Sequence, residues 1–167
     1  MACARCKEEL GGVPEKIEVY VSGNIYKNGM GVGIPGTGMV GLPIAAALGA
    51  VCGKTEYGLE VLKEVSVGDN LQVAKSMLDH NAVKISLKEN APDKLYAEAI
   101  CHKGADSVKT VIVHGHPNIV LVEKNGNTVY SKNDTPVAAE ANERAELSLA
   151  RIWDFVHNIE VEKIDFL

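Results

Sequence analysis

The residues from Ser22 to Gly41 are the ones best suited to bind an anion. This stretch, SGNIYKNGMGVGIPGTGMVG, contains seven glycines. It is predicted to be a long loop, because glycine disfavours a regular helix. Successive glycine N–H groups that lead into a following helix can bind a carboxylate, with Lys27 as a supporting charge. The alternative is that the glycines only permit close packing. The candidate substrate-binding residues here are Asn24, Lys27, Asn28, Gly31, Gly33, Gly36, Thr37 and Gly38.

Part of this stretch also matches the dinucleotide-binding pattern G-x-G-x-x-G, from Gly31 to Gly36. The pattern requires a turn that joins a strand directly to a helix within a βαβ unit. Here the glycines do not directly follow the strand expected at residues 16–21, and Pro35 lies inside the turn. No P-loop lysine follows them. Nucleotide binding is therefore kept only as the weakest of three possible functions.

A second candidate site is the segment His114-Gly115-His116-Pro117-Asn118, which is expected at the end of a strand. Two histidines at positions i and i+2 project to the same side of an extended chain. They could contact a substrate, a subunit interface or a metal, or they could be ordinary turn residues with Asn118 ordering the turn. We include His114, His116 and Asn118 among the substrate-binding candidates and predict no metal ligands in this chain.

The four cysteines do not form a recognisable metal or disulfide pattern. Cys3 and Cys6 form a C-x-x-C pair, but no second pair stands at a matching spacing, and Cys52 and Cys101 lie in apolar surroundings. We predict four scattered, buried, free thiols of the kind found in a reducing compartment.

Composition excludes several classes of function. The 167 residues are 46% hydrophobic but only 5% aromatic, so a core must be built from Ala, Val, Leu and Ile. The net charge of −5 and the absence of any basic block argue against nucleic acid as a partner. There is no apolar run long enough to span a bilayer and no signal-peptide pattern, so we expect a cytoplasmic protein without membrane contact.

The hydrophobic pattern changes near residue 82 from helical spacing to alternation. Helices are predicted at 2–10, 42–51, 59–65, 71–78 and 136–156, with Asp69 as a possible cap of the fourth. Strands are predicted at 16–21, 83–87, 95–101, 107–113, 119–124 and 128–130, with a hairpin turn at 125–127.

These elements predict an α/β (α+β) fold. The glycine-rich loop and helices should precede a mixed, mostly antiparallel sheet with helices on one face, because strands after residue 82 are too close together for crossover helices. Residues 1–167 should form a single unit, possibly with lobes at 1–80 and 81–167. The first helix looks like the end of a longer one, so we expect an internal fragment of a longer protein.

The segments KNGMGVGIPGTG, LPIAAALGAVCG and VIVHGHPNIVLVEKNG together resemble the serine dehydratase-like alpha family, which includes archaeal L-cysteine desulfidase. The resemblance extends from about residue 4 to residue 167. Family members are longer and carry a G-C-T-E-P segment upstream and further cysteines downstream. The resemblance implies that those other cysteines hold a [4Fe–4S] cluster, whose open iron acts on the leaving hydroxyl or thiol. None of the cysteines in this chain matches a cluster ligand.

Three functions are therefore considered. The resemblance implies part of an ammonia-forming lyase that eliminates water from L-serine or hydrogen sulfide from L-cysteine, with its cluster outside this chain and its catalytic residues unassigned. Its partners would be the amino-acid substrate, the rest of the enzyme and possibly a second copy in a homodimer. The alternative is an amino-acid-binding regulatory or assembly module without catalysis of its own. Nucleotide binding is the third.

Overall fold

The computed structural model describes residues 1–133 and 148–160. The chain divides into two units, Met1–Asp134 and Thr135–Leu167. The division expected near residue 80 lies within the first unit, where helix α1 (Ala2–Leu10) packs on strands β5 (Tyr96–Lys103) and β6 (Asp106–Val113), from the other side of residue 80.

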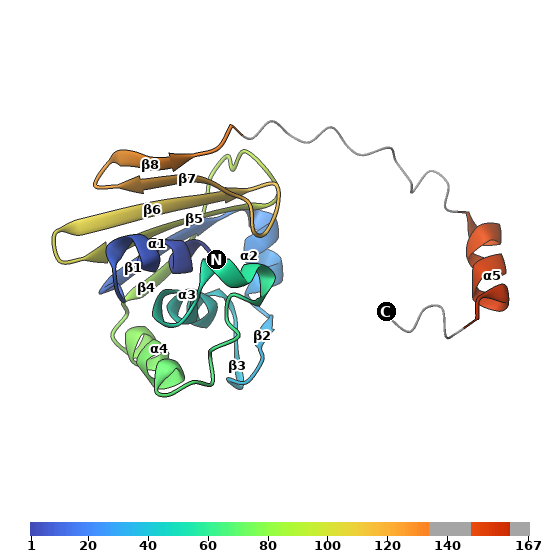
Figure 1. Cartoon of the computed structure of the whole chain (residues 1–167), viewed down its shortest axis with the longest axis horizontal. Helices are drawn as coiled ribbons and strands as arrows, with labels where there is room; N and C mark the ends of the chain where they lie inside the picture. The colour runs from blue at the N-terminus through green and yellow to red at the C-terminus, as the bar shows by residue number, and fades with distance from the viewer. Residues whose placement is uncertain (134–147, 161–167) are drawn as a thin grey trace. The chain divides into compact units, whose positions relative to one another are not determined.

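A six-stranded sheet forms the body of the first unit (Figure 1). Its strands are β1 (Lys16–Val21), β4 (Val83–Leu87), β5 (Tyr96–Lys103), β6 (Asp106–Val113), β7 (Ile119–Lys124) and β8 (Asn127–Ser131), in the order β4-β1-β5-β6-β7-β8. Only the β1–β4 pair is parallel, and the other four pairs are antiparallel. The predicted mixed, mostly antiparallel sheet is confirmed.

Helices cover one face of this sheet, as predicted. Helix α1 (Ala2–Leu10) packs on β5 and β6, while α3 (Leu42–Val51) packs on β1 and β4 (Figure 1). The strand pattern explains why: Ile17, Val19 and Val21 alternate with polar positions and are buried. Their cross-strand partners on β5, residues Cys101, Ala99 and Ala97, share the same face.

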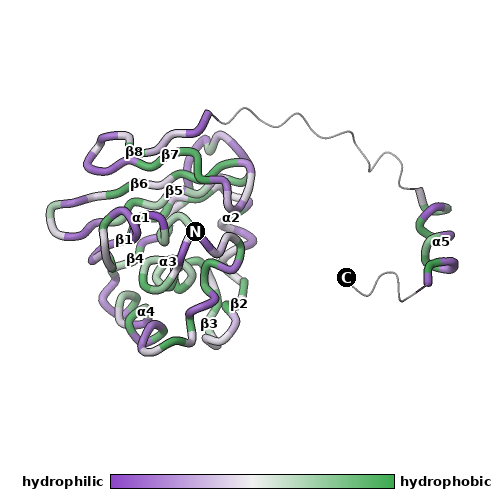
Figure 2. The backbone as a smooth tube through the Cα atoms, viewed as in Figure 1, coloured by the Kyte–Doolittle hydropathy of each residue, from purple (hydrophilic) through white to green (hydrophobic). Residues whose placement is uncertain are grey.

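The helical layer is held close by small residues. Helix α3 is apolar along nearly its whole length (Figure 2), so it is buried on more than one side. Gly49 and Gly53 face α1, and a Cβ on Gly53 would lie 2.5 Å from the Gly49 carbonyl and 2.8 Å from the Ala4 Cβ. Helix α4 (Asn70–Asp79) then packs against α3 and buries Ala74 and Met77.

The glycine-rich stretch is not the long loop that we predicted. Residues Gly23–Gly29 form the short helix α2, with Ser22 as its N-cap accepting a hydrogen bond from the Ile25 N–H. A small hairpin follows, in which β2 (Gly33–Ile34) pairs with β3 (Met39–Val40). The prediction failed because the glycines lie at the end of α2 and in the hairpin turn, where Gly36 and Gly38 adopt positive φ.

The prediction of a helix at 59–65 is also wrong. A short 3-10 helix, η1 (Thr55–Glu60), stands there and is followed by turns. Gly58 has φ 54° and ψ −122°, which no helix accommodates. Asp69 does occupy the N-cap position of α4, but its side chain makes no capping hydrogen bond.

The second unit contains the helix α5 (Leu149–Asn158), which begins after Ser148 caps the Arg151 N–H. The predicted helix at 136–156 is therefore confirmed only from residue 149, and its residues 136–147 lie outside the described part of the chain. Leu149, Ile152, Trp153 and Val156 form an apolar stripe at helical spacing. None of the helices in the described ranges is both long and apolar enough to cross a membrane.

Candidate functional site

The candidate site lies at the carboxyl ends of the two parallel strands. Because β1 and β4 run in the same direction, the segments that follow them begin at the same edge of the sheet. Ligands of open α/β sheets commonly bind at such an edge. A cavity of about 460 Å³ lies between these segments and is lined by Ser22, Gly23, Asn24, Lys88, Ala91, Pro92, Asp93 and Lys94.

Ser22 connects the two chain segments that line this cavity through hydrogen bonds. Its hydroxyl donates a hydrogen bond of 2.6 Å to the Lys94 carbonyl and accepts the N–H of Ile25 at the start of α2. Its backbone N–H donates to the Tyr96 carbonyl. Ser22 is only 3% exposed, so these contacts fix the segment after β1 against the segment before β5.

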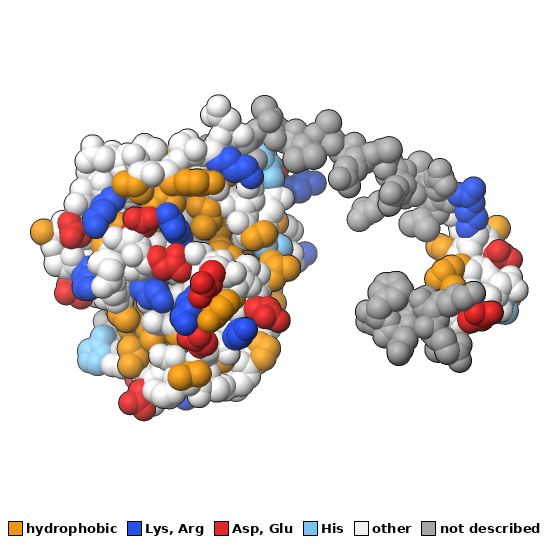
Figure 3. All heavy atoms as spheres, viewed as in Figure 1, with side chains coloured by type: hydrophobic (Ala, Val, Ile, Leu, Met, Phe, Trp, Pro, Cys, Tyr) orange, Lys and Arg blue, Asp and Glu red, His pale blue; other side chains and the backbone are white. Residues whose placement is uncertain are grey.

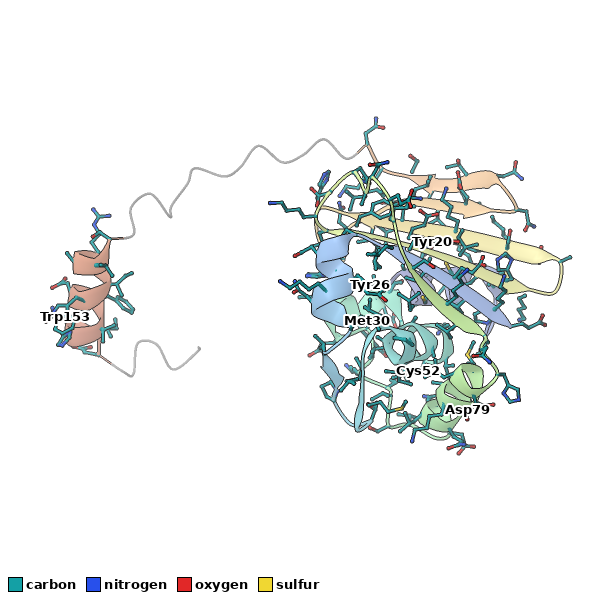
Figure 4. All side chains as sticks on the ribbon, turned by 180° about the vertical axis from the view of Figure 1, so that it is seen from behind. Tyr20, Tyr26, Met30, Cys52, Asp79 and Trp153 are labelled. Carbon is teal, nitrogen blue, oxygen red and sulfur yellow. The ribbon has the colours of Figure 1, made fainter. Side chains whose placement is uncertain are left out.

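The side chain of Lys88 is held by contacts on the face of the sheet that α1 and α3 do not cover. Its Nζ donates a hydrogen bond of 2.7 Å to Glu98 Oε2, and the Tyr96 hydroxyl donates to the same oxygen at 2.7 Å. The ammonium also lies 5.8 Å from the Tyr20 ring centre and 5.7 Å from that of Tyr96. Figure 4 shows Tyr20 projecting from the sheet on the side turned away from the view of Figure 1.

Burial and hydrogen bonding set the ionisation of this network. Burial of Glu98 opposes its charge, but the hydrogen bonds from Lys88 and Tyr96 outweigh that cost and leave the pKa of Glu98 below its usual value. Burial, together with the Glu98 carboxylate as acceptor, raises the pKa of Tyr96. At neutral pH, Glu98 is therefore a carboxylate and Tyr96 a neutral phenol that donates to it.

Asp93 brings the histidine segment to the same edge of the sheet. Its Oδ1 accepts the Leu95 N–H at 2.7 Å, and its Oδ2 lies 3.8 Å from His114 Nε2. His114 has φ 64°, and its N–H donates to the Leu95 carbonyl. The positive φ and this backbone bond turn His114 toward Asp93, away from the line of β6.

The remaining residues of the histidine segment belong to the turn between β6 and β7. Asn118 Nδ2 donates to the Val113 carbonyl at 2.8 Å, which closes the turn between β6 and β7. Its Oδ1 accepts from Lys132 Nζ at 2.8 Å. His116 is exposed. These two residues lie beyond His114 and do not line the cavity.

The structure separates the candidates of the glycine-rich stretch. Asn24 lines the cavity, and its Oδ1 accepts from Asn28 Nδ2 at 3.3 Å, whereas Lys27 is exposed on α2. Figure 4 shows Tyr26 and Met30 on the α3 side of this segment, and Tyr26 packs against the core. The structure therefore brings Asn24 into the cavity with Asp93, and His114 within 3.8 Å of that same Asp93.

The other glycine candidates lie in the β2–β3 hairpin. The Thr37 hydroxyl donates to the Ile34 carbonyl and accepts the Met39 N–H, so it stabilises the hairpin turn. The Val32 and Thr37 N–H groups donate to Gly29 and Ile34. Gly33 and Gly36 line a separate, mainly apolar groove together with residues 59–63, 65 and 66. Gly31 and Gly38 have no neighbour within 4 Å of an added Cβ.

This hairpin does not provide the setting of a dinucleotide fingerprint. Gly33 pairs with Val40 in a two-stranded sheet, and the preceding element is the helix α2. A fingerprint needs a buried strand that leads through the glycines directly into a helix. The order helix, hairpin, helix removes the support for nucleotide binding at these glycines.

Sequence reasoning missed Lys88, Asp93 and the network of Glu98 with Tyr96. A signal was present in β5, where Glu98 stands between Ala97 and Ala99 as the one charged residue in the segment Tyr96–Cys101. A charged residue in such a strand is rarely fully buried unless it is paired. Its partner could not be identified, because Lys88 lies ten residues earlier, after a different strand.

The cysteines are closer together than we predicted. Cys3 and Cys6 lie one helical turn apart on α1 and meet Cys101 on β5, so three of the four are not scattered. Hydrogen bonding with Cys3 and Cys6, together with burial, raises the pKa of Cys101, which keeps its thiol neutral. Cys6 Sγ also lies 3.3 Å from Thr110 Oγ1. All four cysteines are buried free thiols, as expected.

Within residues 1–133 and 148–160, no group of three or more His, Cys, Asp or Glu side chains is arranged to hold a metal ion. The surface over α1 carries acidic and basic side chains interspersed (Figure 3), including Arg5 paired with Glu9. This mixture is typical of a solvated face and gives no continuous field for a polyanion.

Comparison with known proteins finds relatives along the full chain. A UPF0597 protein from Phocaeicola vulgatus is 44% identical over 167 residues, which cover all of this chain and 38% of that relative. UPF0597 proteins from Parabacteroides distasonis and Aeromonas hydrophila are 45% and 39% identical, and the chain covers 39% and 38% of them. No family model and no solved structure matches. The chain is thus homologous along its whole length to UPF0597 proteins and spans about two fifths of the length of these relatives.

Proposed function

We propose that this chain is the amino-acid-facing part of an ammonia-forming lyase that acts on L-serine or L-cysteine. The proposal rests on one observation. Asn24 of the glycine-rich stretch lines the cavity together with Asp93, and His114 of the histidine segment lies 3.8 Å from the same Asp93. Both segments belong to the part of the chain that resembles serine dehydratase-like proteins. Their convergence supports a shared role that their separation in sequence does not suggest.

The polarity of the cavity supports an amino acid as ligand. Lys88 and Lys94 supply positive charge, Asp93 supplies negative charge, and Ser22 and Asn24 supply neutral polar groups. A free α-amino acid carries one carboxylate and one ammonium, so a cavity with both signs of charge complements it. A phosphate-bearing ligand would instead favour clustered cations.

The proposed [4Fe–4S] cluster would belong to a part of the enzyme beyond this chain. The described residues offer no metal-binding group, so we assign no step of the reaction to a metal held here. What this chain contributes in the proposal is binding and orientation of the substrate. The base that removes the α-proton is not assigned.

The test is activity of a relative in its complete length, because the chain spans only about two fifths of it. The Phocaeicola vulgatus protein, purified without oxygen, should release ammonia and pyruvate from L-serine, or ammonia, pyruvate and sulfide from L-cysteine. An alanine at the position equivalent to Asn24 should lower kcat/KM by about tenfold, which corresponds to one lost polar contact in the transition state.

One control variant and one refuting outcome make this test decisive. An alanine at the position equivalent to Asn127, which is exposed on β8 and does not line the cavity, should change kcat/KM by much less. Absence of ammonia release from both amino acids, in protein with its metal content verified, would refute the lyase function. The amino-acid-binding module would then be the function to test next.

A further inference from the structure

We infer that the cavity at the carboxyl ends of β1 and β4 binds the zwitterionic backbone of an α-amino acid, with Lys88 receiving the carboxylate and Asp93 the ammonium. The choice of ligand rests on the proposed function. The assignment of Lys88 and Asp93 rests on the geometry of the cavity, and neither residue belongs to the segments that first suggested a substrate site.

Lys88 is a cation whose position is fixed before a ligand arrives. A lysine side chain normally loses considerable rotamer freedom when it binds. Here the bond to Glu98 at 2.7 Å and the two flanking tyrosine rings already restrict it. Its side chain nevertheless remains 37% exposed, and Lys88 is one of the residues that line the cavity. Lys88 therefore loses less side-chain entropy when a ligand binds, because its side chain is already ordered in the unbound protein.

The ammonium of Lys88 retains donors for a ligand. A lysine ammonium has three N–H donors, and among the described residues only Glu98 accepts a hydrogen bond from it. Asn24 can assist, because Asn28 donates to its side-chain oxygen and leaves its amide nitrogen as a donor. A carboxylate with two oxygens can accept from both residues.

Asp93 provides the opposite charge in the same cavity. Its Oδ1 is engaged by the Leu95 N–H, which orients the carboxylate, and its Oδ2 faces His114 Nε2 at 3.8 Å. That separation is too long for a direct hydrogen bond. The Oδ2 atom can therefore accept from an ammonium group that enters the cavity.

Glu98 acts as a positioning residue and does not touch the ligand. It is 6% exposed and does not line the cavity, and it is anchored by the Tyr96 hydroxyl. Without its charge, Lys88 would keep its own charge but lose its fixed direction. This assignment predicts that a Glu98 variant weakens binding even though the cationic group remains.

The experiment is an NMR titration of this chain with three probes. L-serine carries both charges, acetate carries only the carboxylate, and L-serinamide carries only the ammonium. L-serine should shift the backbone amide signals of Asn24, Lys88 and Leu95 with a Kd of about 1 mM. Acetate should bind more weakly at the same signals, and L-serinamide should bind more weakly still.

Variants separate the assigned roles. K88M should raise the Kd for L-serine about tenfold or more, and D93N should raise it for L-serine but leave acetate binding unchanged. K88R, which keeps the charge and the bond to Glu98, should restore most of the binding. K84M is the matched control, because Lys84 lies on β4 but is exposed and outside the cavity. E98Q should weaken L-serine binding while the dispersion of the spectrum stays native.

Two outcomes would overturn the inference: no shifts with L-serine at saturating concentrations, or equal binding by K88M and the wild type. The result is independent of the lyase assay on the longer relative. If this chain binds L-serine through Lys88 but the relative releases no ammonia, only the proposed reaction fails. If the relative is active but L-serine does not shift the signals of this cavity, only the assignment of the binding site fails.

Discussion

The contact between α1 and α3 and the β2–β3 hairpin use the same residue, glycine, for opposite purposes. Between the helices, Gly49 and Gly53 remove side chains so that two backbones can approach closely. In the hairpin, Gly33 and Gly38 have no neighbour within 4 Å of an added Cβ. Glycine content alone therefore does not identify a ligand-binding loop. The role of a glycine depends on whether a side chain at that position would contact another atom or point into open space.

The two regions also differ in what covers their apolar residues. Ile17 and Leu48, in the helix-covered layer, are fully buried. In the hairpin, Val32 is 53% exposed and Val40 63% exposed. Stability should therefore depend strongly on the first region and weakly on the second.

The largest expected effect is loss of a core side chain. Ile17→Ala should lower the free energy of unfolding by about 3–4 kcal/mol, because a fully buried isoleucine leaves a cavity when truncated. Val40→Ala in the hairpin should lower it by less than about 0.5 kcal/mol. Urea unfolding followed by circular dichroism measures both. Similar losses for the two variants would mean that the hairpin is part of the cooperative core.

The next effect concerns the glycines themselves. Gly53→Ala should cost about 2 kcal/mol, because the added Cβ would meet the Gly49 carbonyl and the Ala4 Cβ and the helices must separate. Gly33→Ala should be almost neutral, since nothing lies within 4 Å of its added Cβ. The same unfolding measurement applies. A neutral Gly53→Ala would show that α1 and α3 can move apart freely.

A third test uses pH on the uncovered face of the sheet. The pKa of Glu98 in the folded chain lies below the usual value of about 4.3. Its contribution to stability is therefore complete above about pH 4.3 and is lost as the pH falls through its lower, folded-state pKa. Glu98→Gln should cost about 1–2 kcal/mol at neutral pH and much less near pH 3.

The matched control for this pH test is Glu89→Gln, because Glu89 is exposed. Its loss of stability should be small and nearly the same at both pH values. If Glu98→Gln and the wild type keep a constant difference in unfolding free energy down to pH 3, the Lys88–Glu98–Tyr96 network does not stabilise the folded chain through the Glu98 charge.

The smallest expected effect lies in the hairpin turn. Thr37→Ala removes the hydroxyl that bonds the Ile34 carbonyl and the Met39 N–H, which should cost the turn about 0.5–1 kcal/mol. Hydrogen exchange at the Gly41 N–H, which donates to the Val32 carbonyl, should accelerate, while exchange in β5 should not change. Equal acceleration in β5 would contradict a locally independent hairpin.

Most of the elements could be predicted from the sequence because their patterns are local. The alternation of Ile17, Val19 and Val21 identified a strand with one buried face, and the short spacing after residue 82 required antiparallel pairing. The predictions failed for Ser22–Gly41 and for 59–65. There, glycine content and helical spacing were misleading, and Ser22 capping and the positive φ of Gly58 decided the local structure.

The sequence by itself determined the fold class, the one-sided sheet, the buried state of the cysteines and the two segments that suggest a substrate site. Only the tertiary structure decided which residues meet. The parallel pairing of β1 with β4 places Lys88 and Asn24 in one cavity, and the registers of β1, β5 and β6 bring Glu98 beneath Lys88 and His114 toward Asp93. Side-chain patterns report which face of a strand is buried, but long-range pairing is chosen by packing of the whole core, so residues far apart in the sequence converge only in the folded chain.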